Sequence, residues 1–215
     1  MKTKKQELIY EQEQEEIAEK VESGTGVIEL QLIGRSPLLM HNPQSMLEKK
    51  ETVSTLDKFD TVKEAKASAY ITEKGELYVP SSAIFGSMLS GASFKKSGKF
   101  SAKSILAGNV KIEVDQIILR DLKGNPLKKY ETDIRTVCLG TGKQKKRIIR
   151  SRPRIDEWRL DFKILFNKKF IQGGKEEIIL QCLEDAGFRI GLLDFRPACS
   201  GSYGTFEVTK FKVVE

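Results

Sequence analysis

The sequence predicts an α+β fold of the ferredoxin-like type, in which an antiparallel sheet has two helices on one face and carries inserted loops. Two kinds of pattern support this prediction. Alternating apolar segments predict strands, and apolar residues at helical spacing predict helices. These elements follow one another as strand, helix, strand, strand, helix, strand. At 215 residues and 39% hydrophobic, the chain suits one such domain with elaborations.

The first half of the chain supplies three of these elements. Residues 27–33 alternate between apolar and polar and predict a half-buried strand. A short extended segment at 75–80 leads into a helix over 83–93, and Ser81 or Ser82 is expected to cap that helix. Residues 110–119 predict the second strand.

The second half supplies the other three. Residues 157–166 give the strongest strand pattern, with one face expected in the core: Trp158, Leu160, Phe162, Ile164 and Phe166. Residues 176–186 predict an amphipathic helix that Gly187 should end. Residues 203–214 predict the last strand, with a bulge near Lys210 where the alternation changes phase.

Charge divides the chain into two parts. We expect a charged leader at 1–26 and a single domain at 27–215, with insertions at about 42–75 and 120–155. Residues 1–23 hold four Lys and seven Glu, net −3, so the remaining 33 basic and 23 acidic groups give net +10. A basic domain attracts polyanions, of which nucleic acid is the most common.

Composition also excludes several classes of protein. The sequence has neither a signal peptide nor an apolar run of membrane-spanning length, which predicts a cytoplasmic location without a membrane partner. Three scattered cysteines and one histidine exclude a disulfide framework and an ordinary zinc site. We therefore expect no metal and no cofactor.

A run of cations between residues 143 and 154 is the first candidate site. Arg150, Arg152 and Arg154 would lie on the same side of an extended segment at ~6.5–7 Å intervals, close to the spacing of successive phosphates in a strand. The alternative is a solvated hairpin tip. The predicted nucleic-acid-binding cations here are Lys143, Lys145, Lys146, Arg147, Arg150, Arg152 and Arg154.

The second candidate site is the glycine-rich segment 187–204. Its glycines would let phosphates approach the backbone, Arg189 and Arg196 would neutralise them, and Tyr203 would stack on a base. A purely structural turn is the alternative. Gly201 and Gly204 complete the predicted contacts in this segment.

The strings at 201–208 (Gly-Ser-Tyr-Gly-Thr-Phe-Glu-Val) and 77–86 (Leu-Tyr-Val-Pro-Ser-Ser-Ala-Ile-Phe-Gly) resemble motifs of the repeat-associated (RAMP) superfamily of CRISPR proteins. The similarity is to the guide-RNA backbone subunit, a ferredoxin-like or RRM-like domain with inserted loops. Small phage and prophage proteins share the strings at 37–41 and 191–197.

This resemblance implies a role in antiviral defence. It implies that a single strand binds over the open face of the sheet, that the 120–155 insertion acts as a basic thumb, and that copies assemble along the strand. It also brings Ser81 and Ser82 into the predicted binding set.

Two catalytic alternatives remain open. His41 could serve as the general base of a metal-independent endoribonuclease, as histidines do in RNA-processing members of the same superfamily, or it could be an ordinary turn residue. Asp57 and Asp60 could support metal-dependent cleavage, but surface solvation is the better interpretation of these carboxylates.

The sequence thus predicts non-catalytic binding of single-stranded nucleic acid, RNA preferred over DNA, through backbone phosphates. It predicts self-association or membership of a multi-subunit complex. The alternatives are an endoribonuclease that uses His41 and a structural or assembly protein.

Overall fold

The computed structural model describes residues 24–46, 60–139, 146–171, 173 and 175–214. Most of the predicted leader, residues 1–23, therefore lies outside the described residues, as does Asp57.

One antiparallel sheet forms the centre of the molecule. Its strands lie in the order β11-β1-β10-β7-β3, and β6 also pairs with β10. The alternating segments at 27–33 and 157–166 form the two central strands. This arrangement confirms the predicted α+β, ferredoxin-like fold. The strands are β1 (Thr25–Gly34), β3 (Tyr78–Pro80), β6 (Val110–Ile112), β7 (Gln116–Arg120), β10 (Arg159–Asn167) and β11 (Phe206–Val214).

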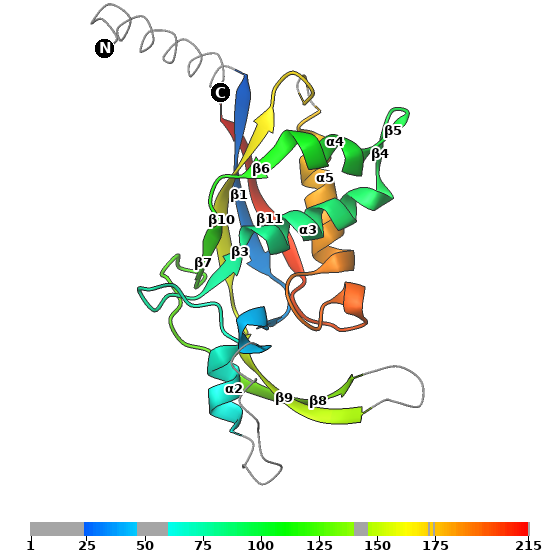
Figure 1. The fold of residues 1–215 in the computed structure, drawn as a ribbon. Coiled ribbons are helices and arrows are strands. Elements are labelled where there is room, and N and C mark those ends of the chain that lie inside the picture. The colour runs from blue at the N-terminus through cyan, green and yellow to red at the C-terminus, as the bar shows by residue number, and fades with distance from the viewer. Residues whose placement is uncertain (1–23, 47–59, 140–145, 172, 174, 215) are drawn as a thin grey trace, which may run out of the picture.

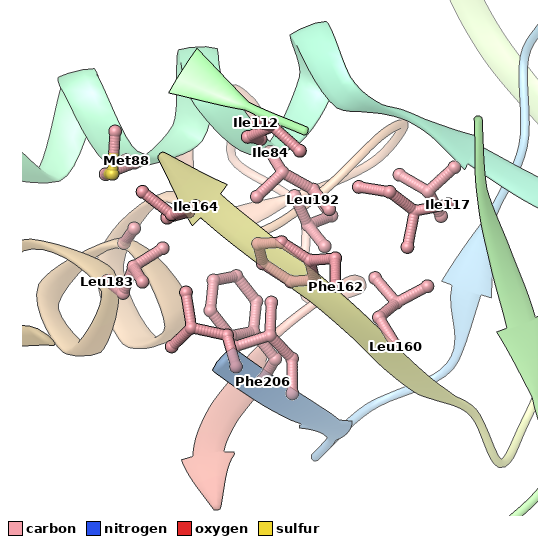
Figure 2. Close-up of a cluster of buried hydrophobic side chains, with 14 of the residues drawn as sticks. Ile84, Met88, Ile112, Ile117, Leu160, Phe162, Ile164, Leu183, Leu192 and Phe206 are labelled. Atoms are coloured by element: carbon pink, nitrogen blue, oxygen red, sulfur yellow. The ribbon is translucent and has the colours of Figure 1, made fainter. Parts of the chain in front are cut away.

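Three helices cover one face of this sheet: α3 (Ser81–Gly91), α4 (Ala102–Asn109) and α5 (Glu177–Asp185) (Figure 1). The core lies between them and the sheet. Figure 2 shows Phe162 and Ile164 of β10 near Leu183 and Phe206, with Met88 and Ile84 on the side of α3. All five residues predicted for the inner face of the 157–166 strand are buried, because strict alternation sends each of them to the helix-covered face.

Two helix boundaries differ from the sequence prediction. Neither Ser81 nor Ser82 caps α3, since Pro80 holds the N-cap position without a side-chain hydrogen bond and the two serines begin the helix. Gly187 does not end α5, because the chain continues through a π-helical turn, η5 (Ala186–Ile190). The turn ends at Gly191, whose φ of 74° suits glycine.

The predicted strand at 110–119 is two strands. Ile112 lies opposite Ile164, and Leu119 lies opposite Leu160. The chain therefore advances seven residues from β6 to β7 while β10 advances only four. The surplus residues bend outward, and the carbonyl of Asp115 there accepts a hydrogen bond of 2.8 Å from the N–H of Ser81. The predicted bulge in the last strand is confirmed: Gln31 pairs with Lys210 and Leu32 with Val208, which leaves Thr209 as the extra residue.

The two predicted insertions meet at one end of the sheet. Strands β8 (Glu131–Leu139) and β9 (Lys146–Ile155) form a hairpin that projects there, and α2 (Thr61–Ala67) packs beside it (Figure 1). Asp60 is the N-cap of α2, because its Oδ1 accepts hydrogen bonds of 3.0 Å from the N–H groups of Val62 and Lys63. The short strand β2 (Leu38–Leu39) pairs with β9 and joins the hairpin to the main domain.

The remaining elements are short. A second hairpin, whose two strands β4 and β5 have two residues each, follows α3 at the other end of the molecule (Figure 1). These elements are η1 (Pro43–Met46), η3 (Ala92–Phe94), β4 (Lys96–Ser97), β5 (Phe100–Ser101) and η6 (Pro197–Cys199).

The open face of the sheet carries charges that are paired with one another. The carboxylate of Asp161 accepts hydrogen bonds from Arg159 at 2.9 Å and from Gln31 at 2.9 Å. The ammonium of Lys210 lies 2.8 Å from the carboxylate of Glu29. A strand bound over this face would have to compete with these pairs. Among the described residues, no helix is long and apolar enough to span a membrane.

Candidate nucleic-acid interface

The predicted arginines of β9 share one face of the hairpin, as alternate residues of a strand must. Each of the three meets a carboxylate. Arg150 Nη1 lies 2.8 Å from Glu64 Oε1, Arg152 Nε lies 2.8 Å from Asp194 Oδ2, and Arg154 Nε lies 2.6 Å from Asp156 Oδ1. The row of three arginines predicted from the sequence is therefore partly neutralised by carboxylates of the protein itself.

The three arginines differ in how far their side chains are exposed, and this difference indicates which of them can reach a ligand. The side chains of Arg150 and Arg152 are only 19% and 9% exposed, whereas that of Arg154 is 32% exposed. Glu64, itself buried, uses its second oxygen to accept a 2.8 Å hydrogen bond from the N–H of Ser151. Arg150 and Arg152 thus attach the hairpin to the domain, and Arg154 is the cation of the three that solvent reaches most readily.

A fourth arginine, Arg135 of β8, lies on the same hairpin face, because it pairs with Arg150 across the two strands. Its guanidinium carbon lies 4.6 Å from the ring centre of Tyr203 and 5.2 Å from that of Phe195. Its Nη2 also donates a hydrogen bond to the hydroxyl of Tyr203. The hydrogen bond to Asp133 raises the pKa of Arg135, so this group keeps its charge.

The glycine-rich segment brings two aromatic rings to this arginine. Phe195 and Tyr203 pack edge to face with ring centres 5.7 Å apart, and Arg154 lies 5.9 Å from the ring centre of Tyr203. We call these four residues the hairpin–turn cluster: Arg135, Arg154, Phe195 and Tyr203. The two candidate sites of the sequence, about 50 residues apart in the chain, therefore meet in space.

Packing within the protein explains two of the predicted glycines. A Cβ on Gly201 would lie 1.8 Å from the carbonyl oxygen of Phe195. A Cβ on Gly204 would lie 2.1 Å from that of Leu192, and Gly204 has a φ of +69°. These glycines are required because two backbone segments of the turn approach closely, and this packing shapes the surface that carries Phe195 and Tyr203.

A cavity of about 530 Å³ lies beside the cluster, between the first turns of α3 and the glycine-rich segment. Ser82 and Arg196, both predicted contacts, line it together with His41, Tyr70 and Asp194. Within it, His41 Nδ1 lies 3.3 Å from Asp194 Oδ2, the same oxygen that pairs with Arg152. Because Nδ1 is engaged, Nε2 is the ring nitrogen left for a ligand.

Asp194 is charged in this setting. Burial would raise its pKa, but the hydrogen bond with His41, the charge of Arg152 and the N–H of Phe195 together lower the pKa below its ordinary value of 3.8. The carboxylate therefore links β2, β9 and the glycine-rich segment as an anion.

The other predicted contacts lie elsewhere or outside the described part. Arg189 faces away from the cluster, 3.4 Å from Asp185 and over the ring of Phe94. Arg196 Nη1 donates to the carbonyl of Leu193 at 2.5 Å. Lys143 and Lys145 lie outside the described residues, and Lys146 and Arg147 belong to β9 in a part where side chains are not described.

Sequence reasoning missed Arg135, Phe195, Asp194 and Glu64. Phe195 and Asp194 stand inside the glycine-rich segment 187–204, for which the predicted contacts are only Arg189, Arg196, Gly201, Tyr203 and Gly204. Arg135 could have been found by pairing the alternating segment 131–139 with the basic run. Across the described residues, no cluster of three or more His, Cys, Asp or Glu side chains could hold a metal ion.

Comparison with solved structures finds this fold in a chain of a known complex. A chain of the type III-B Cmr-beta structure, determined by cryo-electron microscopy with cognate target RNA bound, superposes with a TM-score of 0.58 at 17% identity. The match covers 96% of this chain and 66% of that chain. The chain therefore shares the fold of that Cmr-beta chain.

Cmr6 from Pyrococcus furiosus is similar as well, with a TM-score of 0.46 at 13% identity over 85% of this chain and 98% of that one. Our chain spans just under two thirds of the Cmr-beta chain that it matches. No protein-family model and no curated protein matches the sequence.

The anionic state of Asp194 predicts a pH-dependent stability. Replacement by Asn (Asp194→Asn) should lower the free energy of unfolding near neutral pH by roughly 1–3 kcal/mol, because buried Arg152 loses its counter-charge. A carboxyl whose folded pKa is depressed stabilises the fold above its unfolded pKa of about 3.8, and that stability is lost as the pH falls through the folded value. The gap between parent and variant should stay constant down to about pH 4.5 and shrink below it.

Urea unfolding at a series of pH values measures this gap. Asp156→Asn is the matched control, since Asp156 also pairs with an arginine of β9 but is 49% exposed, and it should change stability by less than about 0.5 kcal/mol. A gap for Asp194→Asn that is independent of pH would contradict the assignment.

Proposed function

We propose that this chain binds single-stranded RNA through its backbone phosphates, without catalysing a reaction, as a subunit of a multi-subunit CRISPR-type complex. The hairpin–turn cluster is the observation that carries the proposal. It combines two guanidinium groups, which suit phosphate oxygens, with the ring of Tyr203, on which a base can stack.

Charge supports the proposal. Residues 24–215 carry a net +10, which gives attraction to any polyanion. All four arginines pair with carboxylates, but the side chains of Arg150 and Arg152 are 19% and 9% exposed, whereas those of Arg135 and Arg154 are each 32% exposed. The attraction near the cluster therefore depends mainly on Arg135, Arg154 and the neighbouring Arg196. Contacts to phosphates are the same whatever the base, so we expect the affinity to depend weakly on RNA sequence and steeply on salt concentration.

The Cmr-beta structure that contains the similar chain is bound to cognate target RNA, which favours RNA over DNA and favours assembly with other subunits. Copies of the chain would then bind side by side along one strand. A purely structural role in an assembly, of a phage or of a defence system, predicts oligomers that form without RNA. Size-exclusion chromatography with and without RNA separates these roles.

The double variant Arg135→Gln/Arg154→Gln should bind single-stranded RNA roughly tenfold more weakly, because two phosphate-binding cations are lost. The slope of log affinity against log salt should fall by about 1 to 2. Fluorescence anisotropy of a labelled oligonucleotide measures both, and single-stranded DNA of the same sequence should bind more weakly than RNA.

The matched control is Lys128→Gln/Lys129→Gln, which removes the same charge from two exposed lysines of the same insertion. Arg154→Gln alone is a further variant. The side chain of Arg154 is 32% exposed, so its replacement should leave the fold intact, and a loss of binding in this variant would not be due to misfolding. If the double variant and the lysine control weakened binding equally, the effect would come from net charge and the cluster would have no specific role.

A second candidate function rests on His41. Asp194 orients the imidazole through Nδ1, and both side chains line the cavity beside the cluster. The imidazole of His41 could take the proton of a 2′-hydroxyl while Arg196 stabilises charge on the adjacent phosphate. The products of such a cleavage would be a 2′,3′-cyclic phosphate and a 5′-hydroxyl.

This second candidate predicts RNA cleavage in the presence of EDTA that is lost in His41→Ala. Our first proposal predicts that labelled RNA stays intact with the parent protein under the same conditions. A His41→Gln variant is the matched comparison, because it keeps a polar side chain in the cavity without a general base. Cleavage by the parent and not by either variant would displace the non-catalytic function.

A further inference from the structure

A second surface, distant from the hairpin–turn cluster, combines exposed aromatic rings with cations. It lies where α3 ends, on the small hairpin of β4 and β5 and on the adjoining π-helical turn (Figure 1). We call it the β4–β5 patch: Phe94, Lys96, Lys99, Phe100, Phe188 and Arg189. None of these residues except Arg189 was singled out by the sequence analysis.

The aromatic side chains of this patch are unusually accessible. Phe94, Phe100 and Phe188 are 53%, 69% and 74% exposed, and two of them stand in the loop that joins α3 to α4. Single exposed apolar residues need no explanation, but Phe94 and Phe100 share one connecting segment, and Phe188 precedes Arg189, whose guanidinium lies over Phe94. These exposed rings offer a surface that a partner can cover.

Cations stand beside these rings in the sequence, and one of them lies over a ring. Residues 94–103 hold four lysines and no acid. The guanidinium carbon of Arg189 lies 4.8 Å from the ring centre of Phe94. The neighbouring carboxylate of Asp185 is already engaged, 3.3 Å from Lys95 Nζ and 3.4 Å from Arg189 Nε.

We infer that the β4–β5 patch is a second contact for the same single strand of nucleic acid. Exposed rings offer faces on which bases stack, and the lysines beside them suit the intervening phosphates, which is the combination used for single strands. The inference rests on the proposed function, since that function supplies the strand.

Small residues line one exposed side of α3, which lies between the two contacts. The exposed face of α3 carries Ser82, Gly86 and Ser90, and Ser90 donates its hydroxyl to the carbonyl of Gly86 at 2.8 Å. Eleven helical residues span about 16 Å, so a strand that runs along α3 needs only a few nucleotides to reach from one contact to the other.

The test compares two single-stranded RNAs, of about four and about twelve nucleotides, in fluorescence anisotropy. Lys99→Ala/Phe100→Ala should lower the affinity for the longer RNA about five- to tenfold and leave the affinity for the shorter RNA unchanged. The matched control is Leu122→Ala/Lys123→Ala, which removes an exposed apolar residue and an exposed lysine from the turn after β7 and should change neither affinity.

Each other outcome overturns a definite claim. Unchanged affinity of Lys99→Ala/Phe100→Ala for the longer RNA overturns the second contact and leaves the proposed function in place. A parent protein that binds neither RNA overturns both. If sedimentation velocity shows that the parent self-associates without RNA and that the variant does not, the patch is a protein interface and the inference is wrong.

Discussion

Two carboxylates, one buried and one partly buried, hold the β8–β9 hairpin against the rest of the molecule, and the candidate interface depends on them. Glu64 of α2 engages Arg150 and the backbone of Ser151, and Asp194 of the glycine-rich segment engages Arg152. Buried ion pairs add little net stability because both groups lose water, but breaking one by removing a single partner is costly. The arrangement therefore serves to fix one orientation of the hairpin, which is what a binding surface made from two distant segments requires.

That orientation divides the cations into two groups. Arg150 and Arg152 are largely buried, while Arg135 and Arg154, although paired with Asp133 and Asp156, are each 32% exposed beside Tyr203. The turn that carries Tyr203 is held in an uncommon backbone shape, since Leu193, Phe195 and Ser200 have φ values of 56°, 52° and 59°. A non-glycine residue keeps such a backbone conformation only where the surrounding packing enforces it. Here Gly201 and Gly204 let two backbone segments of the turn pack closely, and this packing holds the conformation.

Local periodicity was sufficient to predict the fold and insufficient to predict the site. The inner face of β10 and the bulge at Thr209 follow from alternation alone. The break between β6 and β7 does not, because Asp115 bends outward to meet the start of α3, a contact between segments that are distant in the sequence. In the same way, a glutamate in a polar helix such as Glu64 reads as solvated until the hairpin that buries it is in place.

The arginines of β9 also show what local sequence patterns cannot predict. Alternation predicts that Arg150, Arg152 and Arg154 share a face, and they do, but only the tertiary structure reveals which of them meet acids from other elements. Charge density along a sequence therefore overestimates the charge available to a ligand.

Photo-cross-linking tests the central claim most directly, namely that the strand binds where the hairpin meets the glycine-rich turn. The protein is irradiated with a single-stranded RNA that contains 4-thiouridine, and mass spectrometry locates the attached nucleotides. Our account predicts cross-links to Tyr203 and Phe195, whose rings lie beside Arg135. Cross-links confined to the open face of the sheet, around Lys163 and Lys210, would contradict it.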